Sequence, residues 1–255
     1  MDLARTQITV GSGAQERAIA LLRRPGGKVG ILFLGGFMSN MRGTKAEALD
    51  SFAAQEGRAI TRFDYSGGGE SGGRFEDGTI SRWLEEAAAV LRQADGAPLI
   101  LVGSSMGGWI ALLLALGERA AGRRSIAGLV LLAPAVDMTH RLILPHLSAA
   151  VRAQMEETGA WRQPNAHSDQ PYLITRALIE DGGSHLLGDR PIAVGAPVHI
   201  IQGVLDAEVP WGHAVDLVAQ LAEDDVVLTL IKDADHRLSR PQDLKKIIAA
   251  VSAIA

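Results

Sequence analysis

Three segments of this chain consist almost entirely of apolar side chains. They occupy residues 29–34, 99–102 and 129–132, and no charged residue interrupts them. Runs of this kind are typical of strands that are covered on both faces, as in a parallel sheet, whereas a strand with one face in water alternates between apolar and polar residues. We therefore expect a buried sheet with other elements packed on both of its sides.

Further strands and helices are expected to alternate along the sequence. Strands are expected at residues 6–10, 16–23, 28–34, 58–63, 98–103, 126–133, 197–203 and 226–231. Helices are expected at residues 44–56, 79–94, 106–118, 211–222 and 241–254. This alternation predicts an α/β fold with a doubly wound, mostly parallel sheet of eight strands. A short turn at residues 11–13 joins the first two strands, so these two are expected to form an antiparallel hairpin.

One long segment interrupts the alternation. No strand is evident between about residues 137 and 190, and this segment holds three of the ten prolines and four of the seven histidines. Amphipathic helices are expected in it at about 141–157 and 171–180. Because no low-complexity linker flanks the segment, we interpret residues 1–255 as one domain and residues 137–190 as a helical cap inserted within it.

The composition excludes several classes of protein. The net charge is −4 without a basic patch, so a nucleic-acid partner is not expected. The absence of cysteine excludes a thiol nucleophile and disulfides, and it agrees with a cytoplasmic location. No metal-binding motif is present, so neither a metal nor a cofactor is expected. The N-terminus does not resemble a secretory signal, and the apolar runs are too short for stable membrane insertion.

The most specific motif is Gly-Ser-Ser-Met-Gly at residues 103–107. It matches G-x-S-x-G, with an expected strand before it and a helical pattern after it, which is the context of a nucleophile elbow in the α/β-hydrolase fold. Glycines at both ends of the motif avoid collisions across this tight turn. The central residue, Ser105, is therefore the expected nucleophile, and Ser104 is not. The alternative is an ordinary glycine–serine turn at the start of a helix.

A serine hydroxyl needs a base, and in this fold the order along the chain is serine, acid, histidine. His236 is the only histidine after the last expected strand, and it is the expected base. Asp206 follows the strand at 197–203 and is the expected acid, which fixes the histidine tautomer and stabilises the imidazolium. Glu208 and Asp137 are alternative acids. A solvated loop histidine and a turn-forming aspartate are the alternatives to both assignments.

An oxyanion hole requires two backbone N–H donors. One is expected from Met106, which follows the nucleophile, and the other from Phe37, in the loop after the third strand. Gly35 and Gly36 precede Phe37 and allow the backbone to approach a substrate, although a plain glycine turn is the alternative.

A substrate pocket is less well defined by the sequence. Phe37 and four further large apolar side chains are candidates to line an apolar acyl site, but each is equally compatible with an ordinary core position. The four are Met38, Trp109, Trp161 and Trp211.

The glycine-rich stretch at residues 64–73 invites a phosphate-binding interpretation. It lacks the Lys-Ser or Lys-Thr pair that completes a P-loop, so nucleotide binding is not favoured. We expect a structural loop beside the active site, in which Asp64 binds local backbone amides.

Several segments together resemble one branch of the α/β-hydrolase domain family, the branch of the mitochondrial palmitoyl-protein thioesterase, which is also known as an acyl-glucuronide esterase. The resembling segments are residues 36–46, 62–67, 102–109, 209–211 and 235–237. The resemblance covers nearly the whole chain and is greatest in the loops around the expected site. It departs in two respects: no mitochondrial presequence is evident, and Gly35 stands where many relatives of the wider fold have histidine.

The resemblance implies hydrolysis of acyl esters or thioesters by Ser105, Asp206 and His236, with a small-molecule or protein-linked acyl substrate. Two alternatives remain open. The chain is alternatively a non-catalytic module that binds an apolar ligand or a partner protein, or a hydrolase of another bond type, such as a C–C bond. Acyl-chain length, leaving group and oligomeric state are not predicted by the sequence.

Overall fold

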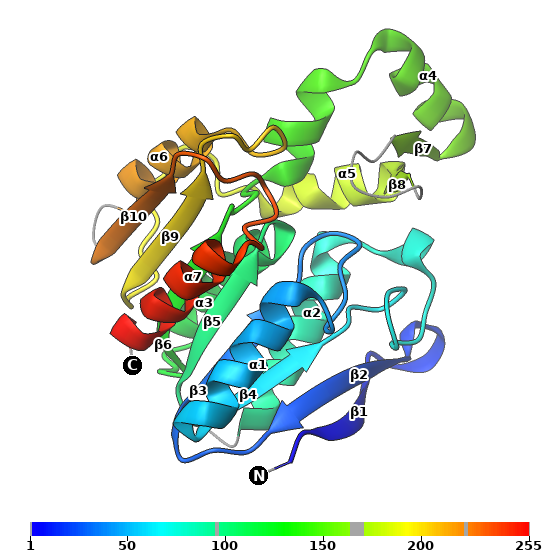
Figure 1. Ribbon diagram of the computed structural model, residues 1–255. Coiled ribbons are helices and arrows are strands. Elements are labelled where there is room, and N and C mark those ends of the chain that lie inside the picture. Colours follow the sequence, from blue (N-terminus) through cyan, green and yellow to red (C-terminus); the bar gives the residue numbers. More distant parts are fainter. Residues whose placement is uncertain (1, 95–96, 164–170, 222–223, 255) are drawn as a thin grey trace.

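A single large sheet organises the molecule (Figure 1). The structure is a computed structural model, which describes residues 2–94, 97–163, 171–221 and 224–254. Within these residues the large sheet has eight strands in the order β1-β2-β4-β3-β5-β6-β9-β10. Their bounds are Ala4–Val10 (β1), Arg17–Arg24 (β2), Lys28–Leu34 (β3), Arg58–Phe63 (β4), Leu99–Ser104 (β5), Ile126–Leu132 (β6), Val198–Gly203 (β9) and Val226–Ile231 (β10).

The strand directions confirm the expected doubly wound sheet. β1 pairs with β2 and β2 with β4 in antiparallel fashion, which includes the expected first hairpin. The remaining neighbours, from β4 through β3, β5, β6 and β9 to β10, are all parallel. The carboxyl ends of these parallel strands therefore meet at one edge of the sheet, which is where ligands bind in open α/β folds.

Apolar side chains leave the central strands toward two separate cores. In β3, Ile31 and Phe33 belong to one core, whereas Leu32 and Leu34 belong to the other. Successive side chains in a strand point to opposite faces, so an uninterrupted apolar run supplies both faces at once. Burial on both faces is the physical reason why these runs lack polar residues.

Helices cover both faces of the sheet. The core on one face includes α1 and α7, and the core on the other face includes α2, α3 and α6 (Figure 1). Their bounds are Thr44–Glu56 (α1), Ile80–Leu91 (α2), Met106–Ala120 (α3), Trp211–Gln220 (α6) and Pro241–Ile254 (α7). These helices lie where the sequence predicted them; position 222, the expected end of α6, lies outside the described residues.

The segment at 137–190 differs from its prediction. It begins with a π-helical turn at Met138–Ile143 and a 3-10 turn at Leu144–His146, followed by α4 at Ala149–Thr158. Two short antiparallel strands follow, β7 (Ala160–Gln163) and β8 (Tyr172–Thr175), and then α5 (Arg176–Gly182). The expectations of no strand here and of a helix at 171–180 were therefore wrong. A short, mostly apolar run such as that of β8 does not by itself show whether it forms a strand or a buried helical turn.

In the glycine-rich loop at 64–73, Asp64 binds backbone amides, as expected. Asp64 accepts hydrogen bonds from the backbone N–H groups of Met41, at 2.6 Å, and of Glu70, at 2.7 Å. Burial raises the pKa of the Asp64 carboxyl, and these two backbone donors oppose the rise. The Asp64 carboxylate thus closes the loop at Glu70 and joins it to the segment at Met41.

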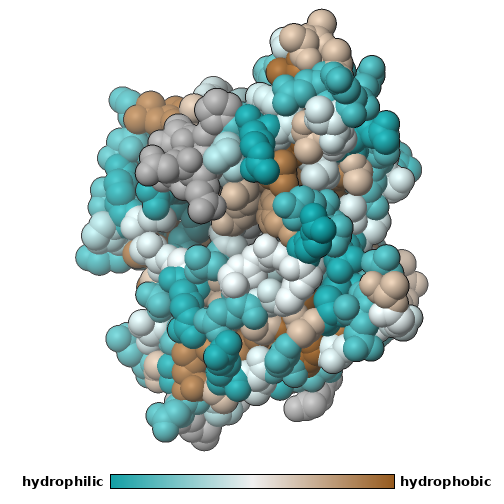
Figure 2. Space-filling view, turned by 90° about the vertical axis from the view of Figure 1, so that its right-hand side faces the viewer, coloured by the Kyte–Doolittle hydropathy of each residue, from teal (hydrophilic) through white to brown (hydrophobic). Residues whose placement is uncertain are grey.

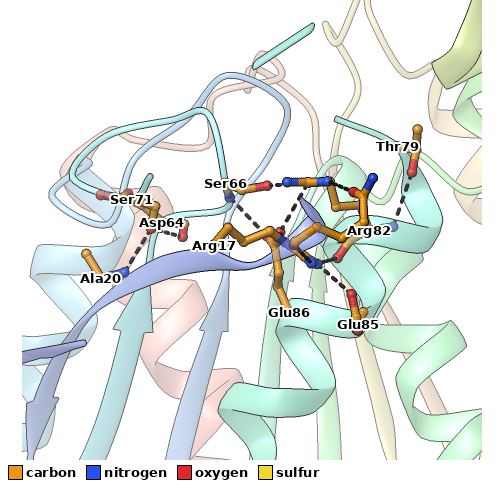
Figure 3. A network of polar contacts seen from close by, with 10 residues as sticks. Arg17, Ala20, Asp64, Ser66, Ser71, Thr79, Arg82, Glu85 and Glu86 are labelled. Carbon is orange, nitrogen blue, oxygen red and sulfur yellow. Dashed lines mark hydrogen bonds and ion pairs between the residues drawn. The ribbon is translucent and has the colours of Figure 1, made fainter. Parts of the chain in front are cut away.

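A buried ion pair fastens the same loop to the rest of the molecule (Figure 3). Glu86 of α2 is fully buried; it accepts a hydrogen bond from Nε of Arg17 in β2 at 2.5 Å and one from the backbone N–H of Ser66 at 2.9 Å. Arg82 donates to the hydroxyl of Ser66. This network holds β2, α2 and the loop in one arrangement next to the carboxyl edge of the sheet.

Candidate active site

Ser105 occupies a strained turn between β5 and α3. Its backbone angles are φ 54° and ψ −120°, far from those of an ordinary residue that begins a helix. A Cβ atom at Gly103 would lie 2.4 Å from the carbonyl oxygen of Gly107, and one at Gly107 would lie 2.1 Å from that of Leu34. Only glycine fits at both positions, which agrees with the sequence-based reason for a nucleophile elbow.

Three side chains from distant parts of the chain meet at this turn. Nε2 of His236 lies 3.0 Å from Oγ of Ser105, and Nδ1 of the same ring lies 2.8 Å from Oδ2 of Asp206. Asp206 stands in the loop after β9, and His236 stands in the loop between β10 and α7. An imidazole in this position is able to accept the serine proton through one nitrogen while the carboxylate orients the other. The structure thus brings together the three residues that the sequence singled out.

Asp206 is itself held by hydrogen bonds. Its Oδ1 accepts the backbone N–H groups of Glu208, at 2.9 Å, and Val209, at 2.8 Å, and its Oδ2 accepts Nε2 of Gln202 at 3.0 Å. Burial opposes ionisation of this carboxyl. The hydrogen bond from His236 and its charge, together with the hydrogen bonds from the Val209 N–H and the Gln202 amide, outweigh burial and lower the pKa of Asp206. The site therefore keeps the carboxylate ionised.

The two alternative acids occupy other positions. Glu208 approaches the opposite ring nitrogen, with its Oε2 3.7 Å from Nε2 of His236, so it is not placed to fix the tautomer through Nδ1. Asp137 accepts the backbone N–H groups of Leu187, at 2.8 Å, and Gly188, at 2.9 Å. Asp137 therefore joins the two ends of the inserted segment and does not contact His236.

The loop after β3 approaches the nucleophile through its glycines. A Cβ atom at Gly36 would lie 3.3 Å from both the carbonyl oxygen of Ser104 and Cβ of Ser105. Within the described residues, the backbone N–H groups of Phe37 and Met106 donate to no protein acceptor. Two free N–H groups beside the serine are the requirement for an oxyanion hole.

A pocket of about 650 Å³ opens beside the serine. Its lining comes from the loop after β3, the start of α1, the inserted segment above the sheet edge and the loops that carry Glu208 and His236. Lining residues include Phe37, Leu142, Ile143, Tyr172, Ile174, Lys45, Glu208 and Arg237. Figure 2 shows one side of the molecule, where apolar surface lies in a recess bordered by hydrophilic residues.

The other four expected pocket residues do not line this cavity. Trp109 is fully buried in the core between α3 and its neighbours, and Trp161 packs in a small separate cluster of the inserted segment. Met38 and Trp211 are 38% and 47% exposed. The sequence did not show this, because the direction of each side chain depends on how its element packs.

Two functional candidates were missed in the sequence. Gln202, buried in β9, supports Asp206 through its amide, and Lys45, in the first turn of α1, lines the pocket. Lys45 lies in the resembling segment at residues 36–46, but no role was assigned to it, and no motif marks Gln202. A signal for Gln202 was its polar side chain directly after the apolar pair Ile200-Ile201 of β9.

Two searches of the described part of the chain were negative. No group of three or more metal-ligating side chains occurs there. None of the helices there has both the length and the apolar character required to cross a bilayer.

The doubly wound sheet, with a serine elbow at its carboxyl edge, defines the chain as an α/β-hydrolase. The family model described as serine aminopeptidase, S33, matches residues 30–178, more than half of the sequence, and the chain belongs to this family.

Named relatives confirm the resemblance to the thioesterase branch. The mitochondrial palmitoyl-protein thioesterase ABHD10 of Bos taurus is 33% identical over 250 residues, covering 97% of this chain and 79% of the relative. A putative hydrolase from Agrobacterium vitis has 47% identity and a TM-score of 0.96, covering 100% of this chain and 99% of that one. Mouse α/β-hydrolase domain-containing protein 10 has 28% identity and a TM-score of 0.85, covering 100% and 98%.

These relatives correct one expectation. The sequence led us to expect a cytoplasmic location, but the similar thioesterases of Bos taurus and Homo sapiens are mitochondrial proteins by name. The cytoplasmic prediction is contradicted by this finding. It rested on the absence of cysteine, which is compatible with any reducing compartment.

Proposed function

We propose that this chain is a serine hydrolase that cleaves acyl thioesters or esters through an acyl intermediate on Ser105. The observation that carries the proposal is the unbroken hydrogen-bond chain from Asp206 through His236 to Ser105, at 2.8 and 3.0 Å. Membership of a hydrolase family and similarity to a palmitoyl-protein thioesterase support the bond type.

The reaction has two halves. Oγ of Ser105 attacks the acyl carbon while its proton passes to Nε2 of His236, and the N–H groups of Phe37 and Met106 stabilise the oxyanion. The C–S or C–O bond then breaks, and His236 returns the proton to the leaving thiol or alcohol. In the second half a water molecule gives its proton to His236, attacks the acyl carbon and releases the acid, and Ser105 recovers its proton.

We further propose that residues 137–190 act as a cap over the site within one domain spanning residues 1–255. The contribution of Met138, Leu142 and Ile143 to the pocket lining supports this role. The apolar character of these side chains suits an acyl chain, since burial of each CH₂ group is worth about 0.8 kcal/mol.

A fluorophosphonate probe and an octanoyl thioester test the proposal. We expect the folded wild-type chain to be labelled at Ser105 and to hydrolyse the thioester. Ser105→Ala is expected to lose labelling and to reduce turnover by about 10⁶-fold, the loss known for the equivalent change in subtilisin. Ser104→Ala is the matched control, because it removes a neighbouring hydroxyl and leaves the elbow serine. A folded wild-type chain without labelling and without turnover would favour a binding module instead.

A further inference from the structure

One wall of the pocket is cationic. Lys45 lies in the first turn of α1, Arg237 follows His236 directly, and both line the cavity beside Ser105. Nζ of Lys45 donates a hydrogen bond to the carbonyl oxygen of Arg237 at 2.5 Å. This bond brings the start of α1 and the histidine loop together and holds the ammonium group next to the reactive centre.

The two cations are not neutralised by an ion pair within the part of the chain that the structure describes. The only hydrogen-bond acceptor of the Lys45 ammonium there is the Arg237 carbonyl, and the Arg237 guanidinium has no carboxylate within 4 Å. Burial lowers the pKa of Lys45 to about 8 and the charge of Arg237 adds to the effect, while the carboxylates of Asp235, Asp206 and Asp243 oppose it without forming an ion pair. Two cations held together in this way repel each other, and an anion bound between them would relieve the repulsion.

The N-terminus of α1 adds positive potential at the same place in the pocket. The N-cap of α1 is Gly43, which has no side chain to accept the first N–H groups of the helix. Gly43, Thr44 and Lys45 all line the pocket. The free N–H groups and the positive end of the dipole of this 13-residue helix therefore act together with the two side chains.

The position of the cationic wall indicates which part of a substrate it contacts. His236 must give its proton to the leaving atom, so the leaving group lies on the side of the histidine loop. Arg237 belongs to that loop and Lys45 is bonded to it. The apolar lining from Leu142, Ile143 and Ile174 of the inserted segment is then available to the acyl chain.

Other charged groups of the pocket limit where an anion can bind. Oε2 of Glu208 lies 3.7 Å from Nε2 of His236 and repels an anion from its own side of the ring. Burial raises the pKa of Tyr172. The Glu208 carboxylate adds to this rise and the Arg237 guanidinium opposes it. Both charges therefore act on the part of the pocket that Tyr172 lines. An anionic group is thereby directed toward the α1 wall.

We propose that Lys45 and Arg237 form a subsite for an anionic group, a carboxylate or a phosphate, carried by the leaving thiol or alcohol of the substrate. The inference rests on the proposed hydrolase function and specifies the substrate class of the same site. It makes Lys45 and Arg237 specificity-determining residues, which act on leaving-group binding and not on the proton transfers.

Three octanoyl thioesters test the subsite. Their leaving thiols have the same length and end in a hydroxyl, a carboxylate or a phosphate. The measured quantity is the ratio of kcat/KM for each anionic thioester to that for the neutral one. We expect a ratio above one in the wild type, and a decrease of about tenfold in Lys45→Met and in Arg237→Gln, because each removes a charged hydrogen-bond donor. Lys45→Arg is expected to retain most of the ratio.

Matched control variants and the use of a kcat/KM ratio distinguish the loss of an anion contact from general damage to the site. Lys245→Met and Arg124→Gln remove exposed cations outside the pocket and are expected to keep the wild-type ratio. Any displacement of His236 in Lys45→Met affects all three thioesters equally and cancels in the ratio. Arg237→Gln leaves the carbonyl oxygen that Lys45 binds.

The outcomes distinguish the two proposals. A kcat/KM ratio above one for the carboxylate or for the phosphate supports the subsite and identifies which anionic group it binds. Hydrolysis of the neutral thioester with no preference for either anion, or with an unchanged ratio in both variants, overturns the subsite while the hydrolase function stands. No hydrolysis of any of the three by the folded wild type overturns both.

Discussion

Oδ2 of Asp206 lies 2.8 Å from Nδ1 of His236, whereas the carboxylate of Glu208, two residues later, lies 3.7 Å from the opposite nitrogen of the same ring. One loop thus places two carboxylates on the two sides of one imidazole. Only the first is in a position to orient the histidine with Nε2 toward Ser105. The second affects the electrostatic field at the proton-transferring nitrogen.

Asp206→Asn is therefore expected to reduce kcat by about 10⁴-fold, the loss seen when the corresponding aspartate of a serine protease becomes asparagine. The amide no longer fixes the correct tautomer, although the fold is kept. The measurement is steady-state hydrolysis of the neutral octanoyl thioester. Glu208→Gln is the matched control, and a loss below about tenfold is expected for it. Equal losses in the two variants would contradict the assignment of the acid.

Gly36→Ala tests the close approach of the loop after β3 to the serine. A methyl group there would lie 3.3 Å from the Ser104 carbonyl oxygen and from Cβ of Ser105, so the loop and the Phe37 N–H must shift by a few tenths of an ångström. We expect kcat to fall by about 10- to 100-fold, because small displacements of catalytic groups have effects of this order.

Gly27→Ala is the control for this change, since a Cβ atom at that position has no neighbour within 4 Å. The free energy of unfolding is measured for both variants by urea titration. If Gly36→Ala retains wild-type kcat, the Phe37 N–H is not the oxyanion donor that we propose.

Glu86→Ala is expected to lower the free energy of unfolding by about 3–5 kcal/mol, because it removes the fully buried carboxylate that binds both the Arg17 guanidinium and the Ser66 N–H. Glu85 is a matched control: it also pairs with Arg17, but its side chain is 53% exposed. Glu85→Ala is expected to cost at most about 1 kcal/mol. Urea unfolding measures both. Similar losses in the two variants would show that the buried pair shown in Figure 3 does not hold the loop at 64–73 to the sheet.

The proposed anion subsite predicts a specific pH dependence. Because the pKa of Lys45 is lowered to about 8, its ammonium is charged at pH 7 and loses its proton well below the pH at which a free lysine does. The carboxylate-to-neutral ratio of kcat/KM is therefore expected to fall as pH rises from 7 to 9.5, with its midpoint near 8. The carboxylate probe stays ionised over this range.

Lys45→Met provides the control for the pH profile. Its ratio is expected to be low at pH 7 and to stay constant up to pH 9.5, because the titrating group is gone. Lys45→Arg is expected to be constant at a high value, since a guanidinium does not titrate there. A wild-type ratio that does not change between pH 7 and 9.5 would show that Lys45 does not bind the anion.

Most of the sheet was predictable from the sequence because its signals are local. The uninterrupted apolar runs at β3, β5 and β6 result from burial on both faces, and each run can be recognised without knowledge of its neighbours. The same holds for the elbow at Ser105, where strand, glycines and helix lie within a few residues. The short strands β7 and β8 were not predicted, because each is only four residues long and depends on its partner.

For the candidate site, too, the sequence predicted some features and not others. Chain order alone singled out Ser105, Asp206 and His236, since each follows an expected strand and the carboxyl ends of parallel strands share one edge. Chain order favoured Asp206 over Glu208, but it did not show that these two residues of one loop approach different ring nitrogens. It also did not show that Trp109 faces the core or that Lys45 meets Arg237, 192 residues away. Such contacts depend on the rotation of whole helices and on the path of loops, and these are set by packing between distant segments and not by the residues next to them.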